Sequence, residues 1–257
     1  MINKRNTQID ELGKAFMRTI AMQVRIQKNV YKYLTFESGK LMLENSNIQF
    51  TRASKLNDSI DCHIDKVDYS AILHNIGLEH NNEIIVEKLR KEAEYFNSIA
   101  VCSLGKSAYN DTLWRRYTRT DGKENGICIE LDTNTTVEHF INEDNIKYGF
   151  VALPVRYVPN VEHSIKRDYL LAGGNFNLVF WSKLVSTKLA SVWEKEEEMR
   201  FVLINGIGDK EYFREVIPTS CITKVILGKD INYRQAEAIE HIIKEKYCGV
   251  PSIEYRQ

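Results

Sequence analysis

The C-terminal end of this chain carries the pattern that most restricts its fold: a strand, then a helix, then a second strand. An apolar run from Ile222 to Leu227 ends at Gly228, helical spacing extends from Tyr233 to Lys246, and a second extended run covers Val250 to Tyr255. A unit of this kind supports a mixed sheet with a helix packed against it. The sequence therefore predicts an α+β fold.

Further apolar runs predict one α+β domain over residues 30–257, built as a single mixed sheet with flanking helices. Strands are expected over residues 30–34, 47–51, 99–104, 126–132, 153–158 (with Pro154 at its start) and from Phe201 onward. Helices are expected from Ser38, over 82–96, 113–117 and 135–143, and over most of 167–193. Residues 212–217 are expected to form a hairpin with the strand at Phe201. No linker or internal repeat divides the domain.

Residues 1–29 form a separate N-terminal extension in this interpretation. Apolar side chains recur at helical spacing between Asp10 and Lys28, at Leu12, Phe16, Ile20 and Val24. This spacing predicts a long amphipathic helix. Its apolar face could pack on the domain or on a partner protein.

Composition excludes several classes of protein. The formal net charge of the 257 residues is zero, from 35 basic and 35 acidic side chains, which argues against a broad nucleic-acid surface. The five cysteines include no CxxC pair, so neither a disulfide scaffold nor a zinc finger is expected. No apolar run approaches the ~20 residues that cross a bilayer. We therefore expect a cytoplasmic protein with no membrane partner.

An acidic run leads directly into a strand near the middle of the C-terminal half. The residues from Trp193 to Arg200 read WEKEEEMR, and the apolar segment FVLI follows. If the strand begins near Glu196, the side chains of Glu196, Glu198 and Arg200 share one face of it. Such a face could line a pocket, or the run could be a solvated acidic helix end.

Other polar residues could join this face. Lys32 lies in mid-strand, and the loop from Lys55 to Asp61 contains Asn57, Asp58 and Asp61. The helix at 113–117 places Trp114 and Tyr117 three residues apart, beside two arginines. Common phosphate-binding, zinc and serine-hydrolase motifs are absent from the sequence.

In order along the chain, these segments resemble the bacterial family known as domain of unknown function 2971. The matching segments are Tyr31-Lys32-Tyr33, Leu56 to Asp61, Cys102-Ser103, Trp114 with Tyr117, Gly126 to Asp132, and a signature of Lys188, Trp193, Glu196, Glu198 and Arg200. Ser59 departs from the proline usual in the second segment. The resemblance spans roughly residues 30 to 230 but implies little about activity.

A second resemblance, to ADP-ribosyltransferases, implies a chemistry. In that superfamily a glutamate of an ExE-like run precedes an apolar strand, an early strand supplies a basic contact, and a middle strand supplies a serine or tyrosine. Glu198 with Glu196, Lys32 and Ser103 occupy these positions here, although Lys32 replaces the commoner arginine or histidine. The resemblance implies an α+β fold of that type and an enzyme that consumes NAD.

This resemblance also implies residue roles. Glu198 and Glu196 would be catalytic, and NAD would be bound as substrate, with no metal, by Lys32, Asn57, Asp58, Ser103, Trp114, Tyr117 and Arg200. The enzyme would be an ADP-ribosyltransferase or an NAD glycohydrolase, serving as a bacterial toxin or an anti-phage effector. A protein or a nucleic acid could accept the ADP-ribose.

Two other functions fit the same residues. The chain could be a non-catalytic module that senses a nucleotide or binds a partner, with Glu196, Glu198 and Arg200 as a structural ion network. It could also be a metal-dependent nuclease, with Asp58, Asp61, Glu196 and Glu198 around Mg²⁺ and Lys188 on a phosphate.

Overall fold

The computed structural model describes residues 27–56, 58, 61–62, 99–141, 149–171, 178–204 and 210–257. Its strands are β1 (Asn29–Leu34), β2 (Asn47–Arg52), β3 (Ala100–Gly105), β4 (Ile127–Asp132), β5 (Gly149–Pro154), β6 (Arg156–Val158), β7 (Thr187–Leu189), β8 (Glu198–Ile204), β9 (Tyr212–Val216), β10 (Ile222–Leu227) and β11 (Ser252–Tyr255). Its α-helices are α2 (Phe36–Asn45), α5 (Asp111–Tyr117), α6 (Thr133–Ile141), α7 (Val161–Leu171), α8 (Leu178–Leu184), α9 (Ala190–Trp193) and α10 (Tyr233–Tyr247). Its 3-10 helices are η1 (Ala53–Lys55), η4 (Glu194–Glu196) and η5 (Thr219–Cys221).

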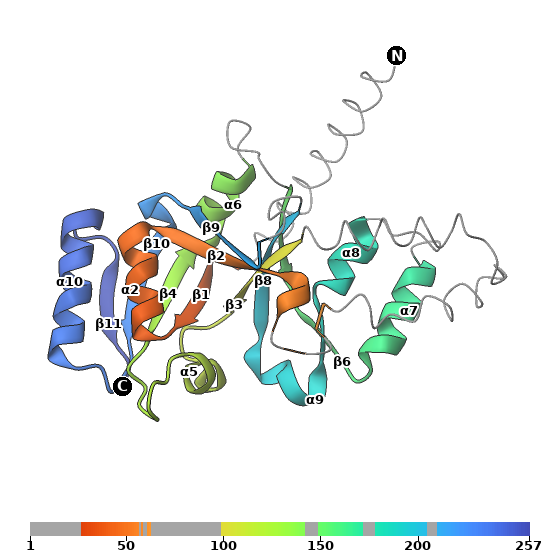
Figure 1. Cartoon of the computed structure of the whole chain (residues 1–257), viewed down its shortest axis with the longest axis horizontal. Coiled ribbons are helices and arrows are strands. Elements are labelled where there is room, and N and C mark those ends of the chain that lie inside the picture. The colour runs from red at the N-terminus through yellow and green to blue at the C-terminus, as the bar shows by residue number, and fades with distance from the viewer. Residues whose placement is uncertain are drawn as a thin grey trace, which may run out of the picture.

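The described elements form an α+β fold around a mixed sheet, as the sequence predicted (Figure 1). The strand–helix–strand unit is confirmed: β10 and β11 are parallel, α10 connects them, and β10 is antiparallel to β4. Asn232 and Gln235 form a capping box at the start of α10, which fixes where this helix begins. The predicted helices over 10–28 and 82–96 lie outside the described residues, except for residues 27 and 28.

The sheet separates between β1 and β3. β1 pairs with β4 along all six of its residues, and β3 pairs with β8 along all six of its own. The two strands β1 and β3, however, share a single paired position, Tyr31 with Gly105. The sheet therefore opens on one side of this position, and side chains from both halves face the opening.

Helices cover both faces of the sheet. On one face, α2, α6 and α10 pack on side chains such as Ile129 and Phe201. On the other, α7 and α8 pack on a smaller group that includes Val202 (Figure 1). Strand β8 is buried along its whole length, with Met199, Phe201 and Leu203 in the first layer and Val202 and Ile204 in the second.

Three local predictions differ from the structure. Strand β9 pairs with β2 and not with β8, because β8 has β3 on one edge and β5 on the other and leaves no edge free. Pro154 ends β5 and does not begin a strand. Helix α2 begins at Phe36, and Thr35 rather than Ser38 is its N-cap.

The segment from Arg167 to Trp193 is less helical than predicted. Helices α7, α8 and α9 occupy part of it, but the three-residue strand β7 lies between α8 and α9 and pairs in parallel with β6. A strand of three residues is too short to show a period in the sequence. It nevertheless places Lys188 next to the acidic run.

A candidate ligand cleft at the opening of the sheet

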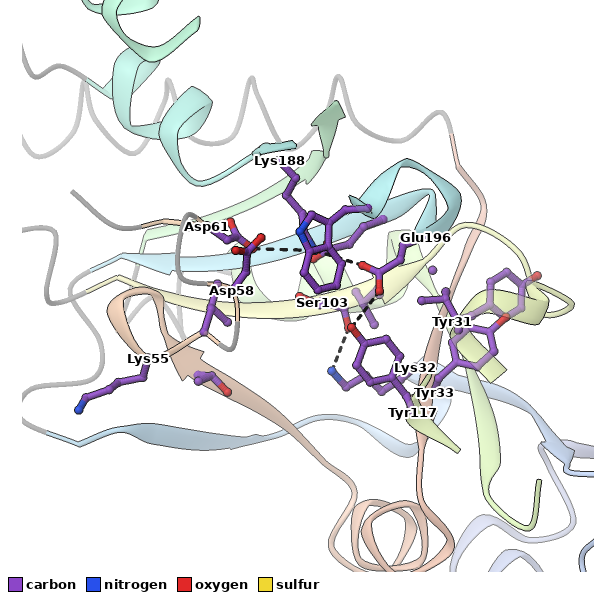
Figure 2. A pocket seen from close by; sticks show the side chains of 17 residues that line it. Tyr31, Lys32, Tyr33, Lys55, Asp58, Asp61, Ser103, Tyr117, Lys188 and Glu196 are labelled. Carbon is purple, nitrogen blue, oxygen red and sulfur yellow. Dashed lines mark hydrogen bonds and ion pairs between the residues drawn. The ribbon is translucent and has the colours of Figure 1, made fainter. Parts of the chain in front are cut away.

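A cleft lies where β1 and β3 separate, and it holds a cavity of about 180 Å³ (Figure 2). Its walls come from strands, helices and a loop that are far apart in the sequence. The lining residues are Tyr31, Lys32, Tyr33, Thr51, Lys55, Leu56, Asp58, Asp61, Ser103, Leu104, Gly105, Leu113, Tyr117, Lys188, Trp193, Glu196 and Glu198. Both predicted catalytic glutamates therefore face the same cleft as Lys32 and Ser103.

Glu198 is the first residue of β8 and is buried in the wall of this cleft, with 3% of its surface exposed. Its carboxylate accepts hydrogen bonds from Lys188 Nζ at 2.9 Å and from Arg200 Nε at 2.8 Å. Its backbone N–H donates to the hydroxyl of Tyr157 at 2.7 Å. These contacts fix both the backbone and the carboxylate of Glu198.

Glu196 reaches the cleft from η4 and not from a strand, which corrects the predicted start of the strand at this residue. Glu197, between the two glutamates, has a φ of 47° and turns the chain at that point. The Oε1 atom of Glu196 accepts from Arg116 Nη1 and from the Tyr117 hydroxyl, each at 2.9 Å. Its Oε2 atom accepts from Lys188 Nζ at 3.1 Å.

Arg200 lies behind Glu198, away from the cavity, with 1% of its surface exposed. Its guanidinium binds Glu198 and both carboxylate oxygens of Asp61, and it also donates to the carbonyl oxygen of Val185 at 2.6 Å. The sequence prediction that Arg200 contacts a ligand is therefore not supported by its position. Arg200 instead links the carboxylates of Glu198 and Asp61 through hydrogen bonds and so fixes the orientation of Glu198.

The acids of this cluster are balanced by cations. Asp61, Glu196 and Glu198 face Lys188, Arg200 and Arg116. Burial raises the pKa of Glu198, but the charges of Arg200 and Lys188, with hydrogen bonds from Arg200 and Ser103, bring it from 4.5 down to about 2. Burial lowers the pKa of Lys188, but the carboxylates, Glu198 first, raise it above its usual value. Glu198 is therefore an anion and Lys188 a cation at neutral pH.

Lys32 and Ser103 lie side by side at the opening of the sheet. The Lys32 ammonium donates to the backbone carbonyl of Ser103 at 2.9 Å. Within the described part of the chain, Lys32 forms no ion pair with a carboxylate, although Asp58, Asp61, Glu196 and Glu198 line the same cleft. It is the cleft cation whose charge is least compensated.

The remaining predicted ligand contacts fall into two groups. Asp58 and Tyr117 line the cleft, and Tyr117 is 40% exposed at its rim. Trp114 does not, because it is fully buried between Tyr33 and Arg256 and its indole N–H donates to the carbonyl of Ala108 at 2.8 Å. The prediction that Trp114 contacts NAD in this cleft is thus wrong. Asn57 lies outside the described residues.

Lys188 and Trp193 line the cleft, although the NAD hypothesis did not include them; among the sequence-based alternatives, the nuclease hypothesis placed Lys188 on a phosphate. Lys188 bridges the two glutamates, and its ammonium lies 4.1 Å from the centre of the Trp193 ring. The Arg116 guanidinium lies 4.6 Å from the same ring. The spacing of Lys188, Trp193 and the glutamates was visible in the sequence, but nothing there indicated that Lys188 is on a buried strand.

Three of the cleft acids, Asp61, Glu196 and Glu198, are paired with basic side chains. In the parts of the chain that the structure describes, no group of three or more His, Cys, Asp or Glu side chains is placed to hold a metal ion. Asp61 and Glu198 share Arg200, and Glu196 and Glu198 share Lys188. These acids therefore form an ion network with basic side chains.

Comparisons with known proteins add no further constraint. Comparison with protein-family models, with curated proteins and with solved structures gave no match to this chain. Of the helices in the described ranges, none has the length and apolar character needed to span a membrane.

Proposed function

We propose that this chain is an NAD-consuming enzyme that binds the dinucleotide in the cleft and cleaves the bond between nicotinamide and ribose. The observation that carries the proposal is the convergence of Lys32, Ser103, Tyr117, Glu196 and Glu198 on one cleft. These residues come from five separate elements, β1, β3, α5, η4 and β8. They include the positions that resemble the reacting residues of ADP-ribosyltransferases.

The charge of Glu198 fits this chemistry. When the C1′–N bond of NAD breaks, its electrons leave with nicotinamide and positive charge builds on the ribose ring. A fixed, buried carboxylate stabilises such charge more than water does, because it is already oriented. With a pKa of about 2, Glu198 provides an anion and no transferable proton at neutral pH. Its role would be electrostatic, with a hydrogen bond to a ribose hydroxyl.

The other cleft residues have matching roles in this proposal. Lys32 would contact the pyrophosphate, because its charge is not consumed by an acid. Tyr117 and Trp193 would pack against the nicotinamide ring. The cavity of about 180 Å³ is smaller than the roughly 300–1,000 Å³ of sites for whole ligands, so the nicotinamide riboside end would enter it and the rest would extend outward.

The final acceptor completes the reaction. A nucleophile, either water or a group on a protein or nucleic acid, would form a bond to C1′ in place of the broken C1′–N bond and release its proton to solvent. Glu196 would orient this nucleophile, since its carboxylate lines the cleft and contacts the Tyr117 hydroxyl. With water as acceptor the chain is an NAD glycohydrolase, and with a macromolecule it is an ADP-ribosyltransferase. The resemblance to ADP-ribosyltransferases suggests a bacterial toxin or anti-phage effector.

The test uses two NAD samples, one labelled in nicotinamide and one in adenine. We expect the wild-type protein to release labelled nicotinamide, and Glu198→Gln to release it at a rate lower by about 100-fold or more. Glu197→Gln is the matched control: the residue is adjacent, carries the same charge and is exposed outside the cleft. Adenine label recovered as free ADP-ribose indicates hydrolysis, and adenine label attached to a protein or nucleic acid indicates transfer. Equal rates for Glu198→Gln and wild type would exclude the role of Glu198.

A second candidate, a non-catalytic nucleotide-binding module, is favoured by one specific observation. Every carboxylate oxygen of Glu196 and Glu198 already accepts a hydrogen bond from Lys188, Arg200, Arg116 or Tyr117. Networks of this kind serve to fix structure in many proteins. Saturable binding of NAD with no release of nicotinamide, from the wild-type protein, would favour this function over the enzyme.

A further inference from the structure

We propose that Lys188 is a positioning residue that holds the two cleft carboxylates together and that its ammonium site is a specific primary-ammonium site. The contacts that support this lie on one atom. Lys188 Nζ is 2.9 Å from Glu198 Oε2, 3.1 Å from Glu196 Oε2 and 3.9 Å from Asp61 Oδ2. The face of Trp193 closes the site at 4.1 Å. Three carboxylates and an aromatic ring thus surround one ammonium. Figure 2 shows Lys188 between Asp61 and Glu196.

The backbone around Lys188 fixes this atom. Lys188 is the middle residue of β7 and is opposite Tyr157 in the parallel pair with β6. The Tyr157 hydroxyl in turn accepts the backbone N–H of Glu198. Tyr157 therefore contacts both the strand that carries Lys188 and the strand that carries Glu198. Lys188 itself is buried, with 5% of its surface exposed.

Charge balance explains why the site needs a cation. The described cluster contains three acids, Asp61, Glu196 and Glu198, and three cations that contact them, Lys188, Arg200 and Arg116. Without Lys188 the cluster carries one uncompensated negative charge in a buried position, which is unfavourable. Glu196 and Glu198 would also lose their common partner and repel each other. A small ammonium ion that can donate hydrogen bonds should then bind in the vacated space.

The test replaces Lys188 by alanine and adds propylammonium, which supplies the three missing carbons and the amine. Tetramethylammonium is the control ion, because it carries the same charge but donates no hydrogen bond. Lys183→Ala is the control variant, since Lys183 also pairs with a buried acid, Asp168, but lies outside the cleft. Propylammonium should raise the melting temperature of Lys188→Ala above that in tetramethylammonium. It should not do so for wild type or Lys183→Ala.

The activity measurements rest on the proposed function. Loss of Lys188 should lower nicotinamide release by about 100-fold, because small displacements of catalytic groups have effects of this size. Adding propylammonium to Lys188→Ala should raise its rate of nicotinamide release by about tenfold, as expected for charge-assisted hydrogen bonds. Lys183→Ala should keep the wild-type rate. Lys188→Met should also move the acid limb of the pH–rate profile upward, because a cation leaves the surroundings of Glu198.

The groups that set this limb are those that face Glu198 and Lys188 from the neighbouring elements. They are Lys32, Asp61, Cys62, Arg116, Tyr117, Tyr157, Glu196 and Arg200. None of these groups is altered in the Lys188 variants. A shift of the limb therefore reports the missing ammonium.

The outcomes separate the two proposals. If wild type does not consume NAD but propylammonium stabilises Lys188→Ala selectively, the proposed function fails and the ammonium site stands. If propylammonium and tetramethylammonium act equally on a folded Lys188→Ala, the ammonium site is overturned. If Lys188→Ala does not fold, Lys188→Met decides: a wild-type rate and pH profile in that variant would overturn the positioning role.

Discussion

Replacing Glu198 by glutamine should destabilise the protein by an amount that depends on pH. The pKa of Glu198 is about 2 in the folded chain and 4.5 in its usual state, because Arg200 and Lys188 outweigh the effect of burial. A difference of about 2.5 units at about 1.36 kcal/mol per unit corresponds to about 3 kcal/mol of stability at pH 7. Glutamine keeps the shape of the side chain and removes this charge.

The sign of the pH dependence follows from the lowered pKa. The stability that Glu198 contributes is fully present above pH 4.5 and is lost as the pH falls toward 2. The difference in unfolding free energy between wild type and Glu198→Gln should therefore shrink from about 3 kcal/mol at pH 7 to about 1.5 kcal/mol near pH 3. Other groups titrate in both proteins, so the difference isolates Glu198.

Urea unfolding monitored by circular dichroism at several pH values measures this difference, provided that both proteins unfold in one reversible transition. Glu197→Gln is again the control and should differ little from wild type at any pH, because Glu197 is exposed. A difference between wild type and Glu198→Gln that is independent of pH would refute the reasoning. It would mean that the ion pairs around Glu198 do not lower its pKa.

Two further predictions concern parts of the fold outside the cleft. Gly228→Ala should lower the melting temperature by several degrees or prevent folding, because an added Cβ would lie 2.1 Å from the backbone oxygen of Glu124; a variant as stable as wild type in a thermal melt would contradict this. Asp168→Asn should cost about 2 kcal/mol in urea unfolding at pH 7, because buried Asp168 pairs with Arg156 and Lys183 next to β7. Burial raises the pKa of Asp168, but these cations lower it overall, so this cost should also decrease in acid, and an increase would contradict the account.

The parts of the structure that follow a local rule could be predicted from the sequence. Alternation along β8 does place Glu198 and Arg200 on the same face as Val202, with Met199 and Phe201 on the other. The C-terminal strand–helix–strand unit could be predicted from the spacing of its apolar residues and from Gly228 at the end of the first strand. In both cases each strand or helix is indicated by the spacing of apolar residues within that element alone.

The rest depended on contacts between distant segments. Trp114 and Tyr117 are three residues apart on α5, yet one is fully buried and the other is 40% exposed at the cleft. The packing of α5 against β1 and Arg256 determines which of the two rings faces the cleft. The pairing of β9 with β2 and the position of Lys188 likewise follow from which strand edges are already occupied, and no local pattern contains that information.

The central claim is that the opening between β1 and β3 binds a dinucleotide, and calorimetric titration of NAD into Glu198→Gln tests it without turnover. The account predicts one binding site per chain and an affinity that falls by about tenfold or more when Lys32→Met is added. Lys40→Met, a change at a surface lysine of α2 away from the cleft, should leave the affinity unchanged. Absence of binding, or an affinity that is the same with and without Lys32, would contradict the claim.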